Sequence, residues 1–337
     1  MLTRIIVLLV SAAAIISVSG CNGNMGGGRQ VFKIENAPAP LFDDPIWHGA
    51  SDPTPIWNAA EKKWFIYYTQ RRATLLPNNN VEYCHGTAIG IASSSDGTNW
   101  KYEGICKGDD NLDKPLENKC TWWAPCVIYN DGIYHMYVSW VDGIYRDWSG
   151  KRFIKHFTSS DGRNFKYQST LKLSSERCID AGVWKVGDKW FMLYKDEGNR
   201  SFSWMAESKN LYDWQVVGQS VSDYSHEAPF VWNWNGKWFL IVDAWSRGLR
   251  IYQSENGIDN WNYISTILVE PGKREKDNVK GSHPGVLVCG NNAYIFYFVH
   301  FNPPHPDYRN NRTVLQVAQL EFKDGKIICD RDKYYKP

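Results

Sequence analysis

Three carboxylates in this chain stand at the starts of similar segments. Asp52, Asp180 and Glu227 each precede a short apolar run, a turn and an aromatic-rich run. This order is typical of a β-hairpin. If the hairpin starts converge, the carboxylates will shift one another's pKa values, because like charges at short range oppose ionisation. Carboxyl groups with displaced pKa values are suited to acid–base hydrolysis of a glycosidic bond.

The same hairpin pattern occurs five times, with starts 72, 56, 47 and 56 residues apart. The five starts are Asp52-Pro53, Ala124-Pro125, Asp180-Ala181, Glu227-Ala228 and His283-Pro284. Related turns at residues 95–100, 160–165, 208–214 and 254–261 join a third to a fourth strand in the first four units. A repeat of this size indicates one supersecondary unit per copy.

Five units of four strands predict an all-β fold, a five-bladed β-propeller with four antiparallel strands per blade. Radial closure removes most of the exposed edges that an open sheet would have. Either residues 31–34 or the C-terminal strands 313–322 and 326–329 complete the ring. The first strand of each blade starts beside the axis, so Asp52, Asp180 and Glu227 are expected around one pocket.

The composition is that of an ordinary globular protein, with 22% charged residues, 43% hydrophobic residues and a net charge of +2. It indicates no nucleic-acid partner, and we expect a monomer. The aromatic content of 15% fits both sheet cores and stacking on sugar rings.

The N-terminal residues predict a targeting segment. Arg4 precedes an apolar run over residues 5–18 that is too short for a stable transmembrane helix. Val18-Ser19-Gly20-Cys21 resembles a bacterial lipobox, with an ordinary signal peptide as the alternative. We therefore expect a lipoprotein signal peptide over 1–20, a flexible tether over 21–30 and the propeller over 31–337. A lipid on Cys21 would anchor the domain in the bacterial cell envelope, facing the periplasm.

Seven further cysteines leave at least one thiol unpaired. Cys126 and Cys289 lie in apolar runs and are expected in the core, whereas Cys106 and Cys120 are spaced to close a loop. The sequence has no Cys-x-x-Cys pair, so no zinc site is expected.

The motifs together resemble glycoside hydrolase family 43 and its five-bladed relatives over residues 40–330. They are Ser51-Asp52-Pro53, Trp123-Ala124-Pro125, Ile179-Asp180-Ala181, Glu227-Ala228-Pro229 and an axial His283. The resemblance implies that Asp52 is the general base, Glu227 the general acid, and Asp180 the residue that orients the acid and tunes its pKa. Ala181 and Ala228 depart from the usual proline and glycine of that family.

Three alternatives remain open. A retaining, fructan-cleaving family shares the fold and uses the first aspartate as nucleophile, but this sequence lacks its Asn-Asp-Pro-Asn and Arg-Asp-Pro motifs. Another five-bladed relative uses a histidine as acid, a role open to His226, His283 or His300. The third alternative is a glycan-binding propeller without catalysis.

The preferred interpretation is an inverting, exo-acting glycosidase that removes a terminal arabinose-, xylose- or galactose-type sugar from a plant or algal saccharide. No cofactor is required, although the resemblance allows calcium in the central channel near His283. Positions beside the predicted pocket supply the substrate-binding candidates, which are Arg71, Arg72, Trp122, Trp123, Lys195, His226, Trp245, Arg247, His283 and Tyr308.

Overall fold

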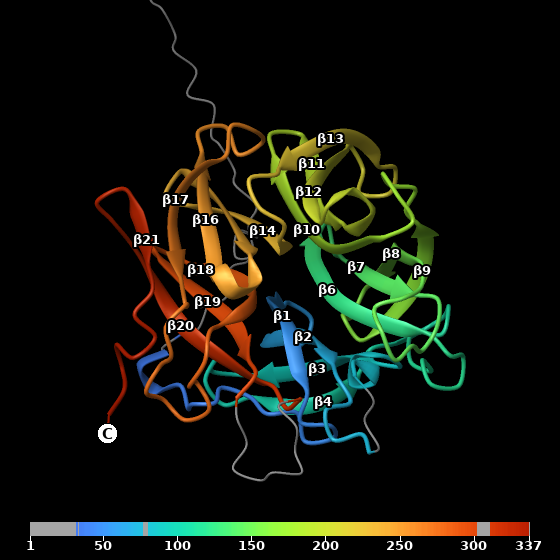
Figure 1. Cartoon of the computed structure of the whole chain (residues 1–337), viewed down its shortest axis with the longest axis horizontal. Helices are drawn as coiled ribbons and strands as arrows, with labels where there is room; N and C mark the ends of the chain where they lie inside the picture. The colour runs from blue at the N-terminus through green and yellow to red at the C-terminus, as the bar shows by residue number, and fades with distance from the viewer. Residues whose placement is uncertain (1–31, 33, 77–79, 302–310, 337) are drawn as a thin grey trace, which may run out of the picture.

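The computed structural model of the chain describes residue 32 and residues 34–76, 80–301 and 311–336. Within them, five antiparallel sheets surround a central axis (Figure 1). The predicted five-bladed β-propeller is therefore confirmed. The signal peptide (1–20), the tether (21–30), Cys21 and Tyr308 lie outside the described residues and stay predictions.

Each blade is one continuous stretch of chain. Blade 1 contains β1 (Ala50–Asn58), β2 (Lys63–Gln70), β3 (Ala88–Ser94) and β4 (Lys101–Ile105). Blade 2 contains β6 (Thr121–Asn130), β7 (Ile133–Val141), β8 (Arg152–Ser159) and β9 (Asn164–Thr170). Blade 3 contains β10 (Cys178–Val186), β11 (Lys189–Asp196), β12 (Phe202–Ser208) and β13 (Gln215–Val221). Blade 4 contains β14 (Glu227–Trp234), β15 (Lys237–Asp243), β16 (Leu249–Ser254) and β17 (Asn262–Ile267). Blade 5 contains β18 (Ser282–Cys289), β19 (Asn292–Val299), β20 (Val314–Lys323) and β21 (Lys326–Ile328). A short strand, β5 (Lys107–Gly108), pairs in parallel with β9 and extends blade 2 to five strands.

The C-terminal strands complete the ring, which is one of the two possibilities that the sequence predicted. β20 and β21 form the outer half of blade 5, and Phe42 and Gly49 of the N-terminal segment bridge to Leu315 and Thr313. Phe32 is buried against the rings of Trp64 and Tyr294, so it seals blade 5 against blade 1.

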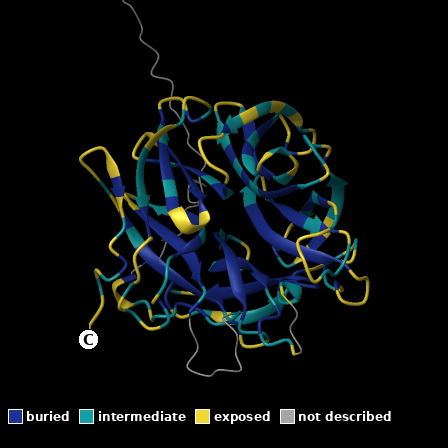
Figure 2. Ribbon diagram, viewed as in Figure 1, coloured by how far each residue is buried: buried dark blue, intermediate teal, exposed yellow. Residues whose placement is uncertain are grey.

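The core lies between the blades, because each sheet is covered on both faces by its neighbours. The second strands are almost entirely buried, and the exposed residues gather at the outer strands and loops (Figure 2). The first strands of adjacent blades come very close at two glycines. A Cβ on Gly182 would lie 2.1 Å from the Pro229 carbonyl oxygen, and one on Gly285 would lie 2.3 Å from that of Pro53. Any side chain there would push the blades apart at the axis.

None of the seven cysteines in the described part of the chain forms a disulfide. The predicted pairing of Cys106 with Cys120 is therefore wrong. Both thiols are buried in one apolar cluster around Leu112, which anchors the intervening loop without a covalent bond. Cys126 is a core residue as expected, and Cys289 is half-buried.

Among the described residues, no helix is both long and apolar enough to cross a membrane.

Candidate active site

A β-bulge interrupts the first strand of every blade at the same place. Two residues there face one residue of the second strand, as between Ser51 and Thr54 of β1. The first residue of each bulge has a positive φ, which is 54° at Asp52, 46° at Ala124, 59° at Asp180, 55° at Ala228 and 36° at His283. This backbone conformation costs roughly 1–2 kcal/mol for a residue with a side chain. The ring therefore concentrates backbone strain around its axis.

The bulges correct the repeat alignment made from the sequence. The fourth equivalent residue is Ala228, and Glu227 precedes it, at the position that Ser51, Trp123, Ile179 and Ser282 occupy in the other blades. Asp52 and Asp180 thus come from one strand position and Glu227 from another. The sequence carries a signal for this alignment, because the second residue of the bulge is a proline in four of the five blades.

Side chains of adjacent blades hold the bulges in place. The amide of Ala124 donates to Thr69 Oγ1 (2.8 Å), and that of Asp180 donates to Ser139 Oγ (3.0 Å). The amide of His283 donates in the same way to Asp243 Oδ2 (3.0 Å). Thr69, Ser139 and Asp243 are equivalent, since each pairs with the residue before the bulge of its own blade. These hydrogen bonds lock neighbouring blades together at the axis.

Asp52 is buried beside two cationic or titratable partners. Its Oδ1 lies 3.3 Å from Arg71 Nη2 and 3.4 Å from His283 Nδ1. Arg71 is itself fixed, with its guanidinium 4.7 Å above the Phe298 ring and Nη1 3.3 Å from His300 Nε2. Although burial opposes the charge, the Asp52 carboxylate keeps the pKa of Arg71 above its usual value. A carboxylate held in this way is suited to accept a proton from water.

Asp180 is also buried, and its Oδ2 accepts a hydrogen bond from the Ala228 amide (3.2 Å). Burial raises the pKa of Asp180 to about 6, and the nearby Glu227 and Asp52 charges act in the same direction. His283 and Lys195 oppose this rise. The three carboxylates thus influence one another's ionisation, as expected for members of one site.

Glu227 forms an ion pair that the sequence did not predict. Lys195 Nζ lies 3.1 Å from Glu227 Oε2. Burial alone would raise the pKa of Glu227, but Lys195, His283 and a hydrogen bond from the Trp245 side chain lower it to about 2. Glu227 is therefore ionised in this structure, whereas a general acid must carry a proton.

Three predicted substrate-binding residues have structural roles. Trp122 is fully buried against Phe157, so its assignment to sugar stacking is wrong. Arg72 is buried and donates to the His85 carbonyl (2.7 Å), and His226 is buried between Ser203 Oγ (2.6 Å) and the Tyr224 carbonyl (2.7 Å). Trp122 faces the core of blade 2, whereas Arg72 and His226 are buried in loops by their hydrogen bonds, which their residue types do not reveal.

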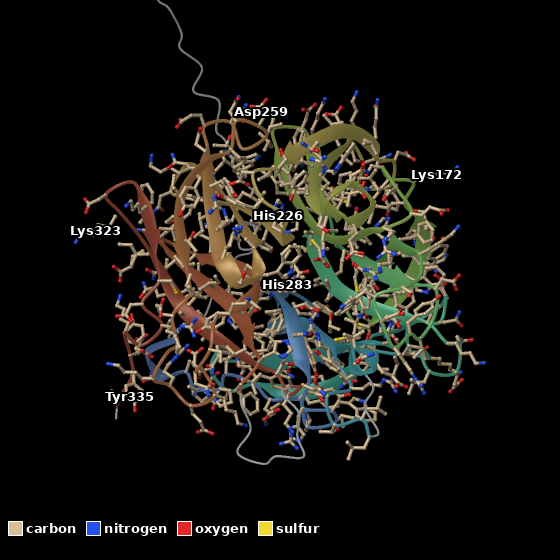
Figure 3. All side chains as sticks on the ribbon, viewed as in Figure 1. Lys172, His226, Asp259, His283, Lys323 and Tyr335 are labelled. Carbon is tan, nitrogen blue, oxygen red and sulfur yellow. The ribbon has the colours of Figure 1, made fainter. Side chains whose placement is uncertain are left out.

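Other predicted residues lie at or near the axis. Figure 3 shows His283 at the centre of the ring and His226 close by. Trp123 is largely buried, with Nε1 donating to the Cys84 carbonyl (2.6 Å). Trp245 and Arg247 belong to the short helix η4 (Trp245–Arg247), where Trp245 is 38% exposed and Arg247 lies 4.3 Å above the Tyr224 ring.

Two charged residues near the site escaped the sequence analysis. Asp243 is buried, and burial raises its pKa, while Lys280 Nζ lies 3.5 Å from its Oδ1. Glu197, in the short helix η3 (Glu197–Asn199), forms ion pairs with Lys195, Arg152 and Arg177. Asp243 could have been found as an aspartate at the end of an aromatic strand, but Glu197 carries no such signal.

No set of three His, Cys, Asp or Glu side chains in the described ranges is placed to hold a metal ion. Near His283, where the family resemblance allowed calcium, the imidazole instead faces Asp52. Calcium near His283 stays a prediction, and no step is assigned to a metal.

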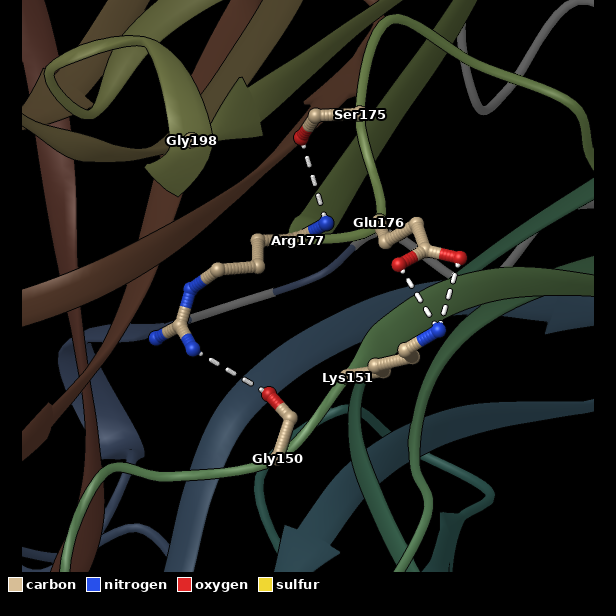
Figure 4. Close-up of a pocket in the computed structure, with 6 residues that line it drawn as sticks. All are labelled: Gly150, Lys151, Ser175, Glu176, Arg177 and Gly198. Carbon is tan, nitrogen blue, oxygen red and sulfur yellow. Dashed lines mark hydrogen bonds and ion pairs between the residues drawn. The ribbon is translucent and has the colours of Figure 1, made fainter.

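A hollow of about 480 Å³ lies between blades 2 and 3 (Figure 4). It is lined by Gly150, Lys151, Ser175, Glu176, Arg177 and Gly198. Its charged groups already have partners, with Lys151 2.8 Å from Glu176 and Arg177 Nη1 donating to the Gly150 carbonyl (3.2 Å). None of the three central carboxylates lines it, so this hollow is separate from the axial site.

Comparison with known proteins agrees with this architecture. The chain is similar to the sucrose-6-phosphate hydrolase of Bacillus subtilis (strain 168), with 23% identity over 161 residues. That match covers 42% of this chain but only 33% of the relative, so it spans about a third of the relative's length. No protein-family model matches the chain.

Solved structures give broader coverage. A thermostable family-43 glycoside hydrolase superposes with a TM-score of 0.62 and 19% identity, over 86% of this chain and 96% of that one. A family-32 β-fructofuranosidase of Bombyx mori gives a TM-score of 0.64 and 15% identity, over 89% of this chain and 66% of that one. The chain has the fold of these glycoside hydrolases. A family-43 enzyme of Xanthomonas citri, solved in complex with xylotriose, also matches, with a TM-score of 0.59 and 13% identity over 83% of this chain and 90% of that one. The predicted resemblance is thus confirmed for the fold.

Proposed function

We propose that this protein is a glycoside hydrolase that removes a terminal sugar with inversion at the anomeric carbon. The observation that carries the proposal is the set of three carboxylates brought together at the axis, of which Asp52 and Asp180 are buried and Glu227 is partly exposed. Burying several acids is unfavourable and needs compensation from paired cations. Here Arg71 and Lys195 provide it for Asp52 and Glu227. A binding protein has no need of such an arrangement.

In the proposed reaction, Asp52 accepts a proton from water while the water oxygen attacks the anomeric carbon. Arg71 and His283 orient the Asp52 carboxylate for this step. The bond to the leaving oxygen breaks as Glu227 transfers a proton to it. Asp180 fixes the backbone beside the acid through the Ala228 amide, and its own charge raises the proton affinity of its neighbours.

The neighbours narrow the substrate class. Their names describe xylosidases, an arabinofuranosidase and fructofuranosidases, and two were solved with xylotriose. These names support an enzyme on xylose- or arabinose-type sugars, and we retain the galactose type and a plant or algal source as expectations from the sequence. The buried positions of Asp52 and Asp180 agree with an exo-acting enzyme that binds one terminal unit.

The lipobox supports a location on the envelope. We propose that a lipid on Cys21 tethers the domain to the membrane, facing the periplasm. Fractionation of cells that express the wild type and Cys21→Ser tests this. The variant should leave the membrane fraction, and retention there would contradict the tether.

A substrate screen tests the activity. Aryl glycosides and oligosaccharides of arabinose, xylose and galactose are incubated with the wild type and Glu227→Gln, and released sugar is measured alongside binding. We expect release from one sugar class by the wild type and at least a hundredfold less by the variant on oligosaccharides. Binding without release by either protein would favour the glycan-binding alternative.

A further inference from the structure

Lys195 occupies a position in blade 3 that other blades use to hold a bulge. Thr69, Ser139 and Asp243 each accept the bulge amide of the next blade there. Lys195 is equivalent to them, since it pairs with Ile179, the residue before the bulge. A lysine cannot accept a hydrogen bond, and the Ala228 amide is bound by Asp180 instead. The lysine is therefore not explained by the architecture of the ring.

The Lys195 ammonium is buried and shared between two carboxylates. Its Nζ lies 3.1 Å from Glu227 Oε2 and 3.1 Å from Glu197 Oε1. The two acids differ in their other partners. Glu197 also binds Arg152 and Arg177, whereas among the described residues Glu227 forms an ion pair with Lys195 alone. Lys195 can therefore leave Glu227 and still be paired with Glu197.

Glu227 can act as the general acid only if the Lys195–Glu227 ion pair separates, because a general acid must carry a proton. With its pKa lowered to about 2, the Glu227 carboxyl is ionised at neutral pH. The charged or titratable groups that face Glu227 are Lys195 (β11), Asp180 (β10), Asp243 (β15), His283 (β18), Arg71 (after β2), Cys84 and His226. Of these, Lys195 makes the largest contribution that lowers the pKa.

Trp245 lies beside the Lys195–Glu227 ion pair and is accessible to a bound sugar. Its ring centroid lies 5.2 Å from Lys195 Nζ, and the side chain is 38% exposed. Trp245 also helps to lower the pKa of Glu227, the residue that protonates the leaving oxygen in the proposed reaction. Aromatic faces of this kind stack on sugar rings. A sugar stacked on Trp245 would place its hydroxyl groups beside the Lys195–Glu227 pair.

We propose that Lys195 is a positioning residue that moves from Glu227 to Glu197 when the sugar of the leaving group binds on Trp245. Glu227 then takes up the proton that it delivers to the leaving oxygen. Protonation of the acid thus depends on an occupied leaving-group subsite, and the preferred substrate is an oligosaccharide rather than a glycoside with a small alcohol. This inference rests on the proposed function.

The test compares Lys195→Met with wild type, Lys195→Arg and the control Lys189→Met. Lys189 lies on the same strand but pairs with Glu207 away from the site. The pH dependence of kcat/KM reports the free enzyme, and that of kcat reports the complex. In Lys195→Met, the limb at which kcat/KM falls with rising pH should move up by roughly 1–3 pH units, the usual effect of losing an opposite charge at this distance. Lys195→Arg and Lys189→Met should leave the limb in place.

A purely structural role for Lys195 would lower activity at every pH without moving the limb, and that result would overturn the inference. A second readout is independent of activity. In ¹³C NMR of carboxyl-labelled protein, with Glu227→Gln to assign the signal, Lys195→Met should raise the titration midpoint of Glu227 by a similar amount. An unmoved midpoint rejects the inference even if the enzyme is active. A raised midpoint with no hydrolysis of any saccharide rejects the proposed function and, with it, the role of Lys195 in the reaction.

Discussion

Replacing Asp180 with asparagine should stabilise the fold at neutral pH while it impairs the site. Burial raises the pKa of Asp180 from 3.8 to about 6 in the folded protein. As pH rises, the unfolded chain releases this proton first, so stability falls between about pH 4 and pH 6 and is constant above. The shift corresponds to about 3 kcal/mol, because one pKa unit is about 1.4 kcal/mol. Asparagine avoids this loss and can still accept the Ala228 amide.

The assay is thermal unfolding of wild type and Asp180→Asn at pH 4.5 and pH 7.5. For a domain of about 300 residues, 3 kcal/mol corresponds to an increase in Tm of roughly 5 °C at the higher pH. At pH 4.5 the increase should be much smaller. Asp161→Asn is the control, because hydrogen bonds from Asn164 and Arg163 outweigh burial and lower the pKa of Asp161 to about 2. That variant should lose a similar amount of stability at both pH values.

The reasoning would be refuted if Asp180→Asn lowered Tm equally at both pH values. Asp180 would then stabilise the fold through its contact with Ala228, and the site would hold no electrostatic strain.

Three further predictions concern stereochemistry, tryptophans and thiols. The first sugar formed should have the inverted anomeric configuration in ¹H NMR, because Asp52 acts through water; a retained anomer would make Asp52 a nucleophile. Trp122→Phe should lower Tm without changing KM, since Trp122 is buried, whereas Trp245→Ala should raise KM for oligosaccharides; the opposite pattern would restore Trp122 as a stacking platform. Thiol titration of the unfolded domain from residue 31 onward should count seven thiols without prior reduction, and fewer would reveal a disulfide.

The repeated hairpin was sufficient to predict the fold, because strand periodicity and turn residues are local signals. Five similar starts such as Asp52-Pro53 and His283-Pro284 imply five blades, and radial closure then brings the starts to one axis. The same reasoning correctly placed Asp52 and Asp180 at equivalent positions.

The finer arrangement depended on tertiary contacts. Glu227 lies one residue before the strand position of Asp52 and Asp180, and the alignment of Pro229 with Pro53 could have indicated this. Trp122 and Trp123 are neighbours in a strand, and only the packing of blade 2 shows that both are buried. Lys195 was predicted to bind substrate, yet its pairing with Glu227 and Glu197 arises from two different blades and a loop.

The assignment of Asp52 and Glu227 as base and acid is tested most directly by changing the leaving group. Kinetics of Glu227→Ala and Asp52→Ala are measured on an oligosaccharide and on the dinitrophenyl glycoside of the same sugar. Because a dinitrophenolate needs no proton to depart, Glu227→Ala should retain much of the wild-type rate on the aryl glycoside and lose it on the oligosaccharide. Asp52→Ala should lose both activities. Small, equal losses for the two variants on both substrates would contradict the assignment.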